Sequence, residues 1–70
     1  MALTDDIADE IALLALDDEL RTGDETIIQQ MAEILGSSSQ TLQEAYLTSI
    51  RVRRAERRAR ELLESRAKTN

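Results

Sequence analysis

Apolar residues recur through the first part of the chain at the three- and four-residue intervals of an α-helix. Together they cover most of a helix circumference: Leu3, Ile7, Ile11, Leu13, Leu14, Leu16 and Leu20. Thr4 is placed to cap the start of this helix, and Gly23 is placed to end it. The pattern predicts a first helix over 4–21 whose apolar surface has to be covered on more than one side.

Two further helices follow, separated by the second glycine. Thr22 and Glu25 match a capping box, so the second helix is expected over 23–35, ending at Gly36. Its predicted buried face consists of Ile27, Ile28, Met31, Ile34 and Leu35. The serines at 37–39 offer caps for a third helix over 38–66, roughly 40 Å long, part of which should project from a domain of this size.

The third helix divides into two halves with different apolar faces. Leu42, Tyr46 and Ile50 share the face expected to point into the core, with Tyr46 buried as its largest side chain. The later stripe is rotated by roughly a third of a turn or more. It comprises Val52, Ala55, Ala59, Leu62 and Leu63. We interpret it as a self-association surface, or as a surface that packs on the acidic first helix.

Composition supports an all-α fold over residues 1–70: a small three-helix domain with a long C-terminal helix, which we expect to self-associate. Leu and Ala dominate and Tyr46 is the only aromatic residue, whereas a sheet uses more Val, Thr and aromatics. A chain of 70 residues buries a modest core, and without Cys or His it lacks the usual ligands for disulfide or zinc stabilisation. Self-association, giving a homodimer, or docking on a partner is therefore expected.

Charge is strongly polarised along the chain. Residues 1–25 contain nine acidic residues and one base, Arg21, whereas residues 51–60 contain six arginines and one acid, Glu56. The arginines are the candidates for phosphate contact: Arg51, Arg53, Arg54, Arg57, Arg58 and Arg60. The alternative is that the acidic first helix and the basic third helix neighbour each other, within or between subunits.

Residues 28–47 carry one recognisable motif. Ala32 is followed four residues later by Gly36, and Leu42 and Ala45 occupy inward positions beyond the turn. This spacing resembles the helix-turn-helix family of DNA-binding proteins, although Ser37 stands where that family usually buries Val or Ile. The resemblance implies a recognition helix beginning near Ser39, with three side chains at the bases: Gln40, Thr41 and Gln43. The alternative is a plain helical hairpin with a Gly-Ser-Ser turn.

Chemistry and location are constrained mainly by what is missing. Without His or Cys we expect no enzyme and no cofactor, and the paired acids lack the loop spacing of a metal site. The longest apolar run, 11–16, is too short to span a bilayer, and acids near the start disfavour export, so a cytoplasmic location is expected. Two functions remain: a small DNA-associated transcription regulator, or a helical protein–protein interaction adaptor that binds no nucleic acid.

Overall fold

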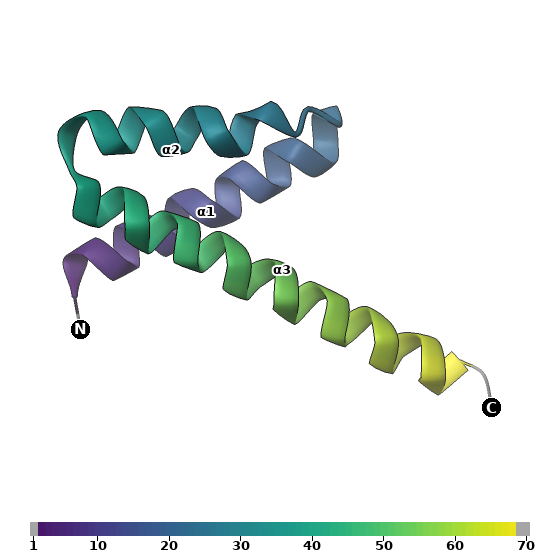
Figure 1. The fold of residues 1–70 in the computed structure, drawn as a ribbon. Helices are drawn as coiled ribbons and strands as arrows, with labels where there is room; N and C mark the ends of the chain where they lie inside the picture. Colours follow the sequence, from purple (N-terminus) through teal and green to yellow (C-terminus); the bar gives the residue numbers. More distant parts are fainter. Residues whose placement is uncertain (1, 69–70) are drawn as a thin grey trace.

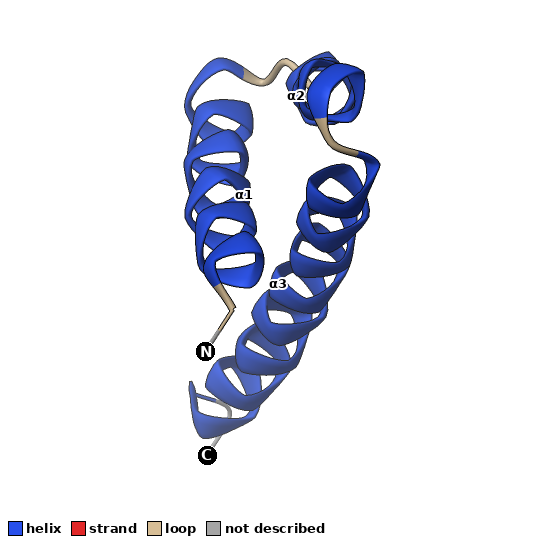
Figure 2. Ribbon diagram, turned by 90° about the vertical axis from the view of Figure 1, so that its left-hand side faces the viewer, coloured by secondary structure: helices blue, strands red, loops and turns tan. Residues whose placement is uncertain are grey.

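The computed structural model describes residues 2–68 and contains three helices, with no strand in that range. They are α1 (Leu3–Thr22), α2 (Thr26–Ser38) and α3 (Gln40–Lys68). In Figure 1, α2 runs back above the first half of α3, while α3 crosses α1 and then extends beyond both other helices. Figure 2 shows α2 end-on, with α1 and α3 descending from it on separate paths. The predicted all-α fold with a long, projecting third helix is confirmed.

Gly23 ends α1, as expected. Its backbone has a left-handed φ of 76°, and its N–H donates to the Glu19 carbonyl at 2.8 Å. Only glycine adopts this conformation without a steric penalty from a Cβ. The start of α1 was predicted wrongly, because the helix begins at Leu3 with Ala2 as its N-cap, so Thr4 lies inside the first turn.

The start of α2 also differs from the prediction. Instead of a Thr22–Glu25 capping box, the Asp24 carboxylate accepts hydrogen bonds from the Thr26 backbone N–H at 2.9 Å and its hydroxyl at 2.6 Å. These bonds hold the pKa of Asp24 below its ordinary value. The Thr22 hydroxyl instead accepts from the Asp24 N–H at 3.1 Å. Asp24 thereby satisfies the first amide of the helix, and α2 begins at Thr26 and not at residue 23.

Gly36 does not end α2, which continues through it to Ser38. A Cβ at Gly36 would lie 2.5 Å from the amide nitrogen of Gln43, so the glycine makes room for that side chain. Ser39 is the only residue between α2 and α3, and its hydroxyl accepts from the Leu42 N–H at 3.1 Å. The predicted serine cap is therefore confirmed at Ser39.

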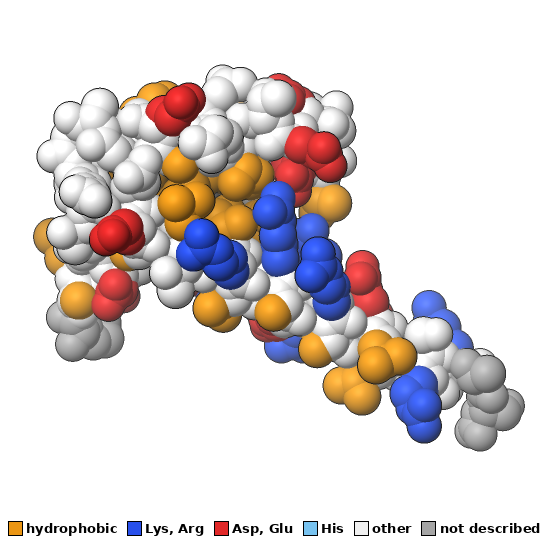
Figure 3. Space-filling view, in the orientation of Figure 1, with side chains coloured by type: hydrophobic (Ala, Val, Ile, Leu, Met, Phe, Trp, Pro, Cys, Tyr) orange, Lys and Arg blue, Asp and Glu red, His pale blue; other side chains and the backbone are white. Residues whose placement is uncertain are grey.

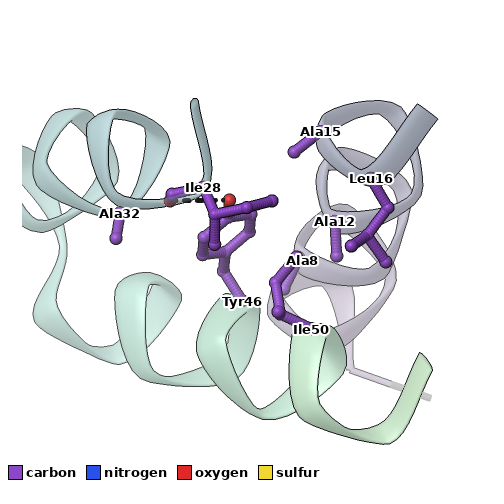
Figure 4. Packing of buried hydrophobic residues seen from close by; sticks show 8 residues of the cluster. All are labelled: Ala8, Ala12, Ala15, Leu16, Ile28, Ala32, Tyr46 and Ile50. Carbon is purple, nitrogen blue, oxygen red and sulfur yellow. Dashed lines mark hydrogen bonds between the residues drawn. The ribbon is translucent and has the colours of Figure 1, made fainter. Parts of the chain in front are cut away.

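Alanine makes up half of the buried core. Figure 4 shows its residues, which come from all three helices: Ala8, Ala12, Ala15, Leu16, Ile28, Ala32, Tyr46 and Ile50. Small residues allow the helices to approach closely. The predicted burial of Tyr46 is confirmed, since its ring is fully buried and its hydroxyl donates to the Ile28 carbonyl at 2.9 Å.

The larger apolar side chains of α1 lie mostly outside this core. Leu3, Leu14 and Leu20 are each more than 60% exposed, and Ile34 of α2 is 62% exposed although it was predicted to be buried. The alanine face of α1, and not its leucine face, packs against α3. Residues 2–68 thus leave one side of α1 exposed, although the sequence predicted that more than one side of this helix would be covered.

Candidate interaction surface

The acidic first helix and the basic third helix contact each other within one chain. Arg53 donates two hydrogen bonds to Asp9, Nε to Oδ1 at 3.0 Å and Nη2 to Oδ2 at 2.6 Å. This paired geometry is the strongest that arginine and a carboxylate can form. It holds the pKa of Asp9 below its ordinary value and raises the pKa of Arg53.

A second ion pair joins the same two helices near the other end of α1. Arg54 donates to Glu19 at 3.0 Å, and the Glu19 side chain is only 16% exposed. Two of the six arginines are thereby held by carboxylates of α1. For these two, the interpretation that acidic and basic helices neighbour each other is confirmed.

Glu56 forms a smaller cluster on α3 itself. It accepts from Arg53 at 3.2 Å and from Arg60 Nε at 3.1 Å. Hydrogen bonds from Arg60 and Arg53 lower its pKa. Such pairs three and four residues apart support a helix where it has few tertiary contacts.

Three of the predicted phosphate-contact arginines have no ion pair with any residue in 2–68: Arg51, Arg57 and Arg58. Arg51 and Arg58 are exposed and Arg57 is half-buried. Figure 3 shows Lys and Arg side chains gathered along α3. Of the six predicted arginines, Arg53 and Arg54 thus bind carboxylates of α1, and Arg60 binds Glu56. The other three face solvent or the groove between α1 and α3.

The residues predicted to contact bases are also divided. Gln40 and Thr41 are exposed at the start of α3. Gln43 is half-buried, and its amide donates to the Ala32 carbonyl at 3.0 Å, which gives it a partner inside the fold. Gln43 pairs with Ala32 and Tyr46 pairs with Ile28, so residues at similar distances on either side of Ser37 meet, as in an antiparallel helical hairpin.

The later half of α3 carries an uncovered apolar stripe. All five residues predicted for self-association are exposed, and we call them the α3 stripe: Val52, Ala55, Ala59, Leu62 and Leu63. Val52, Leu62 and Leu63 are 59%, 62% and 67% exposed. Figure 3 shows apolar side chains following one edge of α3. At about 100° per residue, the stripe is centred roughly 150° from the Leu42–Tyr46–Ile50 face, so it points away from the core.

Grooves open between α1 and α3 and between α1 and α2. One opens where α1 and α3 diverge and is lined by Leu13, Asp17, Arg57 and Glu61 among others. The other, between α1 and α2, is apolar and is lined by Ile11, Leu14, Ile27, Met31 and their neighbours. Within residues 2–68, no group of three or more acidic side chains is arranged to hold a metal ion.

Sequence reasoning missed the specific partners Asp9, Glu19 and Ala32. No local signal identifies them, because they lie 44, 35 and 11 residues from the side chains that they bind. No protein-family model, curated protein or solved structure matches the chain. No helix among the described residues is long and apolar enough to cross a membrane. Any proposal about function therefore depends on the surfaces themselves.

Proposed function

We propose that this protein is a non-enzymatic helical interaction protein that binds another polypeptide through the projecting half of α3. The observation that carries the proposal is the exposure of the α3 stripe on the side opposite the core. Three large apolar side chains on one face of a projecting helix form a surface of the kind that partner proteins cover.

The position of the stripe supports this role. Contacts to α1 and α2 stabilise the first half of α3, and the last ion pair from α1 reaches it at Arg54. Beyond that point the helix depends on its own side-chain pairs, such as Arg60 with Glu56. An isolated helical segment of this length is marginal in water, so a partner packed on its apolar face would add stability as well as specificity.

Photocrosslinking inside cells tests this proposal. A photoreactive amino acid is placed at Leu62 in the stripe and, as a matched control, at Gln29, an exposed position of α2. We expect a discrete adduct from position 62 and none from position 29. Absence of a specific adduct from 62, with the protein folded and expressed, would overturn the proposal.

A second function, a small DNA-associated regulator, is favoured by one specific observation. Arg51, Arg57 and Arg58 have no carboxylate partner among residues 2–68, and Gln40 and Thr41 are exposed on the same helix. Arginines of this kind neutralise phosphates, and Gln and Thr can bond to base edges. The acidic residues of α1 oppose this function wherever they face the duplex.

Fluorescence anisotropy with mixed-sequence duplex DNA tests the second function. The informative variant changes Arg51, Arg57 and Arg58 to Ala, because substitutions at Arg53 or Arg54 would also break the ion pairs to α1. DNA binding predicts an affinity that falls steeply between about 50 and 200 mM salt and is lost in the variant.

The control for that experiment carries the same change in net charge on another helix. Gln29→Glu, Gln30→Glu and Ser37→Asp together make the charge more negative by the same amount without altering α3. If this control loses affinity as severely as the arginine variant, net charge and not the arginine surface governs binding. No binding by the unaltered protein at the lower salt would eliminate the DNA function.

A further inference from the structure

On the side of α3 opposite the core, uncharged residues extend over a longer stretch of the helix than the α3 stripe does. Counting from Val52 in alternating steps of three and four residues places six residues at the a and d positions of a coiled-coil heptad. The a positions are Ala45, Val52 and Ala59, and the d positions are Thr48, Ala55 and Leu62. Ala45 is half-buried and packs against the edge of the core, so the exposed part of the seam consists of the other five residues, from Thr48 to Leu62. A seam of this spacing is the surface that one helix presents to another helix of the same kind.

From Thr48 onward, no other helix within residues 2–68 covers this side of α3. The core face is formed by Tyr46 and Ile50, which are 0% and 2% exposed and pack against α1 and α2. Arg53, on the flank toward α1, is bound to Asp9. Two molecules can therefore bring their α3 helices together back to back, with α1 and α2 of each molecule on the outer sides.

We propose that the partner of the α3 stripe is a second copy of this chain, packed parallel and in register along this seam. This inference rests on the proposed function and names its partner. Alanine and threonine at four of the six seam positions permit a close approach of the two helices, while Val52, Leu62 and the neighbouring Leu63 supply the larger apolar contacts.

Charges beside the seam select the orientation. Arg51 and Arg58 occupy g positions, and Glu56 occupies an e position. In a parallel pair each g residue faces the e residue five positions later in the other helix, so Arg51 meets Glu56 twice, once on each side of the two-fold axis. In an antiparallel pair, Val52 of one helix lies opposite Leu62 of the other. Arg58 of one copy then faces Arg58 of the other, and Glu56 faces Glu56. Opposite charges therefore meet only in the parallel arrangement.

Glu56 has the capacity for this additional contact. Its side chain is 39% exposed, and its two oxygens accept from Arg53 and Arg60 of the same helix. A carboxylate offers about four acceptor sites, so a further guanidinium from the second copy can bind without displacing both existing partners. Arg51 is exposed and has no ion pair with residues 2–68, so it is available to bind Glu56 of the other copy.

Sedimentation equilibrium measures the association directly. Over a range of about 1 to 500 µM protein, we expect the mass to rise from 7.9 kDa toward twice that value. Leu62→Glu should weaken the dimer at least about tenfold while the cooperative thermal unfolding of the core is retained, because this side chain lies outside the core. Leu14→Glu is the matched control, since Leu14 is 63% exposed on α1 and lies outside the seam.

Disulfide trapping tests the orientation. The chain has no cysteine, so Val52→Cys and Ala59→Cys each introduce one thiol, and a parallel, in-register pair places each thiol opposite its own copy. Both variants should then oxidise to disulfide-linked dimers, whereas a control Gln29→Cys should not. An antiparallel pair would link no more than the position nearest its two-fold axis, and that result would overturn the parallel arrangement.

The two proposals fail in different ways. A mass of 7.9 kDa at every concentration, with no cross-linking of either cysteine variant, would overturn the second copy as partner. Photocrosslinking at Leu62 that nevertheless yields an adduct with a different protein would retain the proposed function. An adduct of twice the chain mass would support both proposals.

Discussion

Tyr46 offers the sharpest test of how this small core is held together. It is the only aromatic residue, it is fully buried, and its hydroxyl joins α3 to the Ile28 carbonyl of α2. Replacing it by Phe removes the hydrogen bond and keeps the ring. Because the net contribution of such a bond is about 1 kcal/mol, Tyr46→Phe should lower the free energy of unfolding by about that amount. For a domain of this size, this corresponds to a fall in melting temperature of about 4–8 °C.

Replacing Tyr46 by Ala should be far more damaging. Loss of a buried ring leaves a cavity and costs about 3–5 kcal/mol in well-packed cores. Domains of this length have a total stability of roughly 4–10 kcal/mol, so the alanine variant should be close to unfolding at room temperature. Half of the core cluster is alanine, and a side chain without a rotatable χ angle cannot reorient to fill the space.

Urea and thermal unfolding followed by far-ultraviolet circular dichroism measure both variants. Leu14→Ala serves as the control, because this side chain is 63% exposed and its truncation should cost well under the loss at Tyr46. The free energy of unfolding should decrease from the wild type to Tyr46→Phe and further to Tyr46→Ala. A loss below about 1 kcal/mol for Tyr46→Ala would refute the conclusion that this ring is the centre of the core.

Three further predictions concern the glycine in α2 and two titrating groups. Gly36→Ala alone should change the free energy of unfolding little, because the gain from a better helix former is offset by displacement of the Gln43 amide. In a Gln43→Ala background the same substitution should stabilise the protein by about 1 kcal/mol, measured by urea unfolding. The folded pKa of Asp9 lies below 3.8, so its pairing stabilises the protein above that pH and is lost as pH falls below it. Asp9→Asn should therefore lower stability near about pH 7, and this loss should shrink as the pH falls below 3.8, so a loss that stays constant across that range would contradict the ion pair. Burial raises the pKa of Tyr46 above 10.0, so stability should decline as pH rises beyond that value, and Tyr46→Phe should remove this part of the alkaline loss when unfolding is followed by circular dichroism.

Short-range sequence signals correctly place two of the helix termini and the core face of α3, although they misplace the starts of α1 and α2. Gly23 ends α1 and Ser39 caps α3 because glycine tolerates a left-handed backbone and serine offers an oxygen to a helical amide. The spacing of Leu42, Tyr46 and Ile50 places one face of α3 in the core for an equally local reason, the helical repeat. The length of the uninterrupted pattern after Ser39 also predicts that α3 projects.

Other features depend on contacts between distant parts of the chain. Gly36 resembles a helix stop in sequence, yet α2 continues through it, and Gln43 from the next helix occupies the space that a Cβ would fill. The leucines of α1 suggest the buried face, but the alanines pack inside because α3 crosses there at close range. The arginines of α3 are equivalent in sequence, whereas Asp9 and Glu19 select Arg53 and Arg54 through the direction in which α3 crosses α1.

The sequence by itself thus determined the helices, their order and the two faces of α3, since these depend on residues within a turn or two of each other. Tertiary structure alone decided which arginines are bound, which of the predicted base contacts has an internal partner, and which apolar residues are left uncovered. The physical reason is that packing and charge pairing depend on where helices cross, and a crossing is set by side chains up to 44 residues apart.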